Sequence, residues 1–408
     1  MNSVVRRGAD EILAALYTGA GRRDPYPLYD ELHLLGPASL TPASEQYAAV
    51  ANGFGAVDQV LRDHRFVKGG GAPKPDDDAI TTALYSSMMF RTEPDHGRMR
   101  RVFHQVFTPR RVTALEPRIE QLTDDLLERL AGLGADGRPV DFIAEFGYLL
   151  PAGVMSALLG IPDPDLEWFR IRVQRVEDYL DLGGRTPEKI AAANAAATEM
   201  SDYYRELIAR RRVEPTEDLV SGLVQAVGSG AHELTDDELV GNLLVLFNAS
   251  FVTTINLLGN ALPPLLERPE LVEKLVADPD VAAECVEEVL RYDGTAQLLV
   301  RTASEDLPVG DVVVPRGGVV LLLLGAANRD PRRFEDPARF DADRADKRHI
   351  SFGAGPYFCV GAALARTEGR LALPRLFRRF PGLALAGTPV QSAGLALRGY
   401  EKLPVTLG

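Results

Sequence analysis

The sequence predicts a mainly α-helical protein with small β-sheets, because its helical patterns are long and its strand-like runs are short. Residues 112–133 place apolar side chains at helical spacing with acidic residues between them. Residues 191–212 repeat that pattern and finish in three consecutive arginines, which suit the C-terminal end of a helix dipole.

A long apolar helix is predicted over about residues 239–262. The preceding Thr235-Asp236-Asp237-Glu238 has the composition of an N-terminal capping segment. Pro263-Pro264 should end or kink this helix, since proline lacks the backbone donor that a helix needs.

Short strands are expected near five segments: residues 46–50, 299–303, 312–314, 319–324 and 396–405. The longest apolar run, residues 319–327, has about half the length of a membrane span. Its first part is interpreted as a buried strand that ends at Gly325.

Length and composition predict one large domain over residues 1–408, with no linker or internal repeat dividing it. The hydrophobic fraction of 46% is ample for a large core. A net charge of −13 argues against nucleic acid as a partner. Residues 1–10 contain no long apolar region, so we expect neither a signal nor a membrane anchor, and a cytoplasmic location.

The two cysteines lie far apart and do not indicate a disulfide framework. Cys285 is expected in the core. The six histidines show no spacing that pairs them with cysteines, so a structural zinc site is not expected.

Cys359 lies in the most informative segment, Ser351-Phe352-Gly353-Ala354-Gly355-Pro356-Tyr357-Phe358-Cys359-Val360-Gly361. The glycines before the cysteine allow a tight turn that lies flat against a large group. The predicted helix after Gly361 would direct its positive end towards the sulfur and favour a thiolate. Such a loop suits a haem-thiolate centre. The alternative is a redox-inert buried cysteine in a glycine-rich turn.

This loop resembles the haem-binding loop of the cytochrome P450 family, Phe-Gly-x-Gly-x-(usually basic)-x-Cys-x-Gly. The matching positions are Phe352, Gly353, Gly355, Cys359 and Gly361. The resemblance implies haem b (iron protoporphyrin IX) with Cys359 as axial ligand. Tyr357 departs from the pattern, because the family usually places His or Arg there to bind a haem propionate. The phenol can donate one hydrogen bond but brings no positive charge.

Further segments follow the family's order along the chain. Glu288 and Arg291 match its Glu-x-x-Arg pair, whose spacing puts both side chains on one helical face. The resemblance implies that Arg339 completes this pair as a third, structural residue. Residues 328–331 and 336–337 resemble the meander before the cysteine loop. Without the resemblance, a solvated surface ion pair would be the simpler interpretation.

Three basic residues match the family's propionate-binding positions. His96 and Arg100 stand four residues apart, on one face of a predicted helix, and Arg301 falls on a predicted strand. Surface charge is the alternative for each of them. Nearby arginines on an otherwise acidic protein could steer an acidic electron carrier, or form a solvated helix face: Arg98, Arg101, Arg110 and Arg111.

The helix around residues 243–254 aligns with the family's oxygen-side helix, often Ala-Gly-x-(Asp/Glu)-Thr. Ala249 and Thr253 match, whereas Ser250 replaces the glycine and Val252 replaces the acid. A mid-helix threonine can also be a core residue that bonds the preceding turn. The missing acid leaves open how protons reach oxygen.

The resemblance implies a monomeric monooxygenase that takes electrons from a ferredoxin-type carrier and inserts oxygen from O2 into a small molecule. It places the substrate cavity around largely apolar segments, namely residues 86–90, 176–182, 243–254, 298–299 and 397–399. We therefore expect a medium-sized, mainly hydrophobic substrate, such as a bacterial natural-product intermediate. The alternatives are an oxidative coupling or cyclisation catalyst, a peroxide-dependent catalyst, and a non-catalytic accessory homologue.

Overall fold

The computed structural model describes residues 7–69, 71–162, 165–180, 186–228 and 234–408, most of them in helices. The chain forms two compact units, each assembled from separate stretches of sequence. The sheet unit comprises Met1–Gly69, Glu287–Cys359 and Gln391–Gly399. The helical unit comprises Gly70–Val286, Val360–Val390 and Tyr400–Gly408.

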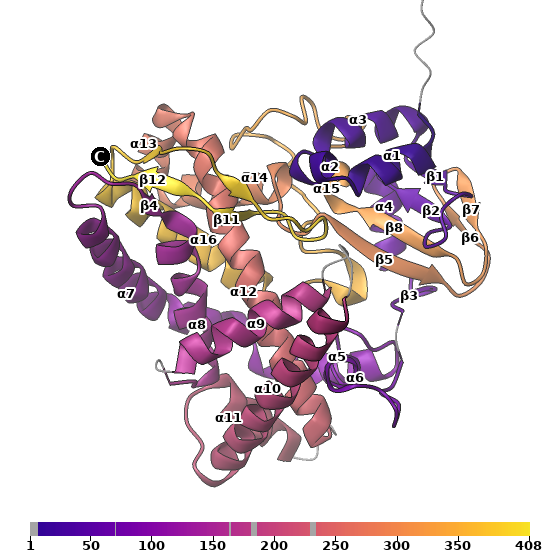
Figure 1. The fold of residues 1–408 in the computed structure, drawn as a ribbon, viewed down its shortest axis with the longest axis horizontal. Coiled ribbons are helices and arrows are strands. Elements are labelled where there is room, and N and C mark those ends of the chain that lie inside the picture. Colours follow the sequence, from indigo (N-terminus) through magenta and orange to yellow (C-terminus); the bar gives the residue numbers. More distant parts are fainter. Residues whose placement is uncertain (1–6, 70, 163–164, 181–185, 229–233) are drawn as a thin grey trace, which may run out of the picture. The chain divides into compact units, whose positions relative to one another are not determined.

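The sheet unit contains a five-stranded sheet in the order β1-β2-β8-β5-β3, in which only the β2–β8 pair is parallel (Figure 1). Its helical segments are α1 (Ala9–Leu16), α2 (Gly19–Arg23), α3 (Tyr26–Leu35), α4 (Phe54–Arg62), α15 (Leu324–Ala327) and the 3-10 turn η3 (Gly355–Tyr357). Its strands are β1 (Ala38–Leu40), β2 (Ala49–Ala51), β3 (Phe66–Val67), β5 (Leu298–Ala303), β6 (Leu307–Val309), β7 (Val312–Val314) and β8 (Val319–Leu323).

Strand β8 is apolar throughout because both faces of the sheet are covered. Leu321 and Leu323 belong to a cluster that includes Ile12 of α1 and Leu32 of α3. The alternate residues Val320 and Leu322 belong to a second cluster, with side chains from α4. Since neighbouring strand residues point to opposite faces, a strand covered on both sides has no polar face. The predicted buried strand is confirmed.

The helical unit is built mainly from long helices: α5 (Ala79–Tyr85), α6 (Asp95–Val106), α7 (Pro109–Leu133), α8 (Leu149–Leu159), α9 (Leu166–Leu180), α10 (Pro187–Val213), α11 (Leu219–Gly228), α12 (Asp236–Leu266), α13 (Pro269–Ala277) and α16 (Ala362–Arg379). A π-helical turn, η1 (Ile143–Gly147), precedes α8. Strands β4 (Val140–Asp141), β12 (Pro404–Thr406) and β9 (Ala384–Leu385) form a small sheet, and β11 is Tyr400–Lys402. Two elements are divided between the units, namely α14 (Pro279–Tyr292) and β10 (Val390–Gln391).

Helix α12 begins where the capping segment predicts. The Thr235 hydroxyl accepts from the Glu238 amide at 3.1 Å, and the Glu238 carboxylate accepts from the Thr235 amide at 3.0 Å. The helix runs through Pro263 and Pro264 and stops at Leu266, less than one turn later. Within the described ranges, α12 alone is long and apolar enough to cross a membrane, but 72% of its most apolar window is buried inside the protein.

The two other predicted helices are confirmed as α7 and α10, which begin three and four residues earlier than the apolar pattern. Thr108 and Thr186 cap these helices, and a proline follows each cap at the first helical position. The predicted strands are also found, although residues 396–405 contain two strands instead of one.

Candidate functional site

The Cys359 loop turns through two glycines that no other residue could replace without strain. Gly353 and Gly355 have φ values of +70° and +66°, in the left-handed region. At Gly355 a Cβ atom would lie 2.5 Å from the Leu61 carbonyl oxygen, so the loop also packs too closely for a side chain. The Cys359 amide donates to the Phe352 carbonyl at 2.9 Å and closes the turn.

Cys359 is exposed, whereas Cys285 is fully buried. The alternative of a redox-inert buried thiol therefore does not describe Cys359, and the expected core position of Cys285 is confirmed. The helix predicted after the cysteine is α16, which begins at Ala362 directly after Gly361.

The start of the loop is fixed by buried polar contacts. The Asn328 side chain donates to the Ser351 hydroxyl at 2.7 Å and accepts from the Ile350 amide at 2.9 Å. The Ser351 hydroxyl in turn donates to the Leu290 carbonyl near the end of α14. Because Asn328 and Leu290 belong to the meander and to α14, these contacts link three separate segments of the sheet unit.

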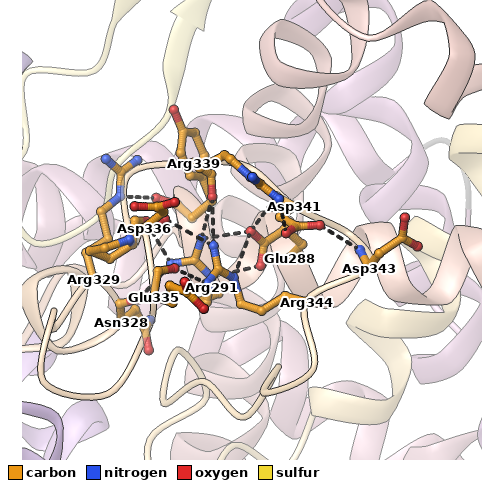
Figure 2. Close-up of polar contacts among 12 residues, drawn as sticks. Glu288, Arg291, Asn328, Arg329, Glu335, Asp336, Arg339, Asp341, Asp343 and Arg344 are labelled. Atoms are coloured by element: carbon orange, nitrogen blue, oxygen red, sulfur yellow. Dashed lines mark hydrogen bonds and ion pairs between the residues drawn. The ribbon is translucent and has the colours of Figure 1, made fainter.

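Glu288 and Arg291 form a buried, two-bond ion pair on α14. Both N–O distances are 2.7 Å, and both side chains are 0% exposed (Figure 2). The remaining Arg291 donors meet three backbone carbonyls, those of Asn328, Pro337 and Arg339, at 2.9–3.1 Å. The pair therefore anchors the meander that leads to the cysteine loop, and it is not a solvated surface pair.

The expectation that the Arg339 side chain completes this pair is wrong. Its guanidinium turns towards the Asp341 carboxylate, 2.6 Å away, and the Arg339 side chain is 64% exposed (Figure 2). Arg344 is instead the buried arginine beside the pair, with Nε 3.7 Å from the Glu288 carboxylate. It also donates to the carbonyls of Asp336 and Arg339 at 3.1 Å. Arg339 contributes only its backbone.

The two predicted basic residues of α6 lie on one helical face in the helical unit. His96 is buried, with Nδ1 2.9 Å from the Glu93 carboxylate, and this hydrogen bond lowers the pKa of Glu93. The Arg100 Nε donates to the His104 ring at 3.0 Å. The surface-charge alternative therefore does not hold for His96.

Two of the four nearby arginines have internal partners. Arg98 donates to the Glu238 carboxylate at 2.9 and 2.6 Å, which raises the pKa of Arg98. Arg111 donates to the Asp218 carbonyl at 3.1 Å. Arg101 and Arg110 are exposed, so the basic surface is smaller than the sequence indicated.

Arg301 is buried on β5, and its guanidinium carbon lies 5.1 Å from the centre of the Tyr357 ring. Among the described residues it meets the Val300 carbonyl and that ring but no carboxylate. Burial lowers the pKa of Arg301 to about 10, because the charged form loses solvation. Lys68, which the sequence analysis missed, lies 5.3 Å from the same ring centre.

The residues at the oxygen-side positions of α12 bond to their own helix. The Thr253 hydroxyl donates to the Ala249 carbonyl at 2.8 Å, and the Ser250 hydroxyl donates to the Phe247 carbonyl at 2.9 Å. Val252 is half-buried, and α12 contains no acidic residue after Glu238. This stretch therefore offers hydroxyl groups but no carboxylate for moving protons.

The residues present fit a haem. An exposed cysteine on a glycine turn suits a thiolate ligand, and the buried Arg301, which meets no carboxylate among the described residues, suits a propionate. Two of the predicted cavity segments, residues 176–180 and 243–254, are helical, whereas residues 86–90 form a turn and residues 298–299 begin β5. Residues 181 and 182 lie outside the described residues.

Comparisons with known proteins agree with this fit. The cytochrome P450 family model matches residues 35–390. Cytochrome P450 107B1 of Saccharopolyspora erythraea is 41% identical over 363 residues, 88% of this chain and 85% of that protein. The polyketide biosynthesis cytochrome P450 PksS of Bacillus subtilis is 39% identical, covering 78% of this chain and 77% of that protein. The crystal structure of P450BioI, in complex with a hexadec-9Z-enoic acid ligated acyl carrier protein, has a TM-score of 0.88 at 31% identity. It covers 95% of this chain and 100% of that chain.

Proposed function

This chain belongs to the cytochrome P450 family, and from that premise we propose that Cys359 is the axial ligand of its haem iron. It is an oxidoreductase of the monooxygenase class. The assignment rests on the exposure of Cys359. This cysteine follows a turn of left-handed glycines and stands where the family's sequence pattern has its iron ligand. The bound haem, proposed to be haem b, would supply the oxidising chemistry.

His96, Arg100, Arg301 and Tyr357 are the proposed contacts of the haem propionates. Arg301 supports this role most directly, because its buried guanidinium meets no carboxylate among the described residues. Leaving such a charge uncompensated is unfavourable, and a propionate would offset that cost. Phe352, Gly353 and Gly361 would shape the loop around the cysteine. The glycine turn leaves room for a flat macrocycle.

Protons would be delivered through Thr253 and ordered water. The Thr253 hydroxyl is oriented by its bond to Ala249, with Ser250 one turn nearer the start of the helix. Val252 cannot exchange protons. The substrate itself would complete the chain if it brings a polar group near Thr253.

The proposed substrate is a medium-sized, mainly hydrophobic natural-product intermediate. Residues 243–247 and 298–299 are apolar, so the cavity that they are proposed to line would favour such a molecule. PksS, one of the relatives, is named for polyketide biosynthesis. Oxygen insertion is the proposed outcome because Thr253 is retained. The alternative to oxygen insertion is an oxidative coupling of the substrate at the same site.

Cytochromes P450 of bacteria take electrons from redox partners and bind small molecules. We propose a ferredoxin-type carrier for this chain, with Arg101 and Arg110 as the exposed positive charges that would attract it. We further propose that residues 1–408 act as one haem-thiolate domain, as a monomer in the cytoplasm.

Reduced protein treated with carbon monoxide tests the assignment of Cys359. Thiolate ligation should give a strongly red-shifted Soret band. Cys359→Ser should abolish this band, whereas the buried Cys285→Ser should keep it. If Cys359→Ser kept the band, or if Cys285→Ser removed it, the assigned ligand would be wrong.

A further inference from the structure

Two cations flank the Tyr357 ring, and both come from neighbouring strands of the sheet unit. Arg301 belongs to β5, and Lys68 directly follows β3. The antiparallel register pairs Phe66 with Ala303 and Val67 with Thr302, so the next position places Lys68 opposite Arg301. Residues directly opposite on neighbouring strands project to the same face of the sheet.

Like charges in directly opposite positions destabilise a sheet. Arg301 is buried and Lys68 is half-buried, so water screens their repulsion less than it would between two exposed charges. Burial, and secondarily the charge of Arg301, lowers the pKa of Lys68 to about 7. The Tyr357 ring eases the repulsion by cation–π contact with both groups, at 5.3 and 5.1 Å, but it carries no full negative charge. The arrangement therefore favours an anion between the two cations.

Resting on the proposed haem-thiolate function, we propose that Lys68 binds a haem propionate together with Arg301. Lys68 then supplies, from a different segment, the positive charge that Tyr357 does not bring to the loop. A carboxylate between an ammonium and a guanidinium would receive charge-assisted hydrogen bonds from both. Tyr357 fills the space between the two cations and adds at most one hydrogen bond from its phenol.

The test uses haem transfer from the ferric holoprotein to an excess of apomyoglobin, a measurement that does not depend on activity. Lys68→Met should release haem roughly tenfold faster than the wild type. This ratio corresponds to a loss of about 1.4 kcal/mol of haem binding free energy. Lys68→Arg should restore slow release, since it keeps the charge. Lys74→Met, at an exposed lysine of the same region, should match the wild type.

Two further measurements separate a propionate contact from a fold defect. The thermal midpoint of the haem-free protein should stay unchanged or rise in Lys68→Met, because the substitution removes a repelled cation. Reconstitution with haem dimethyl ester, whose propionates carry no charge, should erase the difference in release rate between the wild type and Lys68→Met.

The proposal would be overturned by wild-type haem release from Lys68→Met, by a lowered midpoint of the haem-free variant, or by a rate difference that persists with the diester. The proposed function is tested by a different measurement, since it would be wrong if Cys359→Ser kept the red-shifted Soret band of the reduced carbon monoxide complex. A normal thiolate band together with unchanged haem release in Lys68→Met would overturn the role of Lys68 alone.

Discussion

Glu288 and Arg291 are joined by two parallel hydrogen bonds of 2.7 Å in a region closed to solvent. The Glu288 carboxylate also accepts from the Asp341 amide at 2.8 Å. The pair is therefore surrounded by backbone groups of the meander, and no part of it is exposed for contact with a ligand. Its role is to hold the segment that leads to Cys359.

Glu288→Ala should destabilise the protein by roughly 3–5 kcal/mol, because it leaves the buried Arg291 charge without a partner. Little folded, haem-loaded protein should be recovered, as judged by the ratio of haem absorbance to protein absorbance. Glu335→Ala, at an exposed side chain of the same meander, is the matched control and should be unaffected. A folded Glu288→Ala variant with full haem and altered substrate preference would contradict the structural role.

Arg344→Ala should destabilise the protein far more than Arg339→Ala. The Arg344 side chain is 8% exposed and contacts the Glu288 carboxylate and the meander carbonyls. The Arg339 side chain is solvated beside Asp341, and only its carbonyl accepts from Arg291. Urea unfolding of both variants measures the difference. Equal losses, or a larger loss in Arg339→Ala, would restore Arg339 as the third member of the pair.

Thr253→Ala should lower the yield of product per electron consumed, because the hydroxyl proposed to relay protons is removed. General acid assistance contributes typically about 10²–10⁴ in rate, so a change in this relay should be measurable. Val252→Asp should change turnover with the true substrate by restoring a carboxylate beside Thr253. Unchanged yield in the first variant, or unchanged turnover in the second, would argue against this proton path.

Labelled O2 separates oxygen insertion from oxidative coupling. Insertion should add one labelled oxygen atom to the product, and coupling should give a product that has lost hydrogen and gained no label. The product mass therefore tests the proposed reaction independently of the proton path.

Glu368 should make the folded protein less stable as the pH rises. It is buried in α16, and within the described part of the chain its Oε2 atom has no hydrogen-bond partner. Burial raises its pKa from 4.5 to about 8, so the folded state keeps a proton that the unfolded chain loses. Below pH 4.5 Glu368 is protonated in both states and the folded state keeps its full stability. That stability is lost progressively as the pH rises from 4.5 to about 8, because the unfolded chain gives up the proton first.

Glu368→Gln should remove this dependence, since the amide stays neutral throughout. The free energy of unfolding of the wild type should fall, relative to the variant, by up to about 1.4 kcal/mol per pH unit within that window. Denaturant unfolding at pH 5 and pH 8 measures this difference, with the exposed Glu335→Gln as control. The same pH slope in the wild type and in Glu368→Gln would show that this carboxyl is not responsible.

The sequence by itself determined the elements whose signals lie within a few residues of one another. The cap at Thr235 and Glu238 placed the start of α12, and the glycines before Cys359 predicted the tight turn. Such signals are readable because a helix cap or a left-handed turn is decided by neighbouring backbone groups. The apolar run of β8 was equally clear, since a strand covered on both faces needs no polar residue.

The tertiary structure alone decided which arginine accompanies Glu288 and which lysine faces Arg301. Arg339 and Arg344 lie five residues apart in one irregular segment, where no helical or strand period predicts which side chain turns inward. Lys68 reaches Arg301 only through the pairing of β3 with β5, two strands far apart in the sequence. The sequence did not predict two-residue strands such as β3 either. A strand of that length exists only where a partner strand supplies its hydrogen bonds.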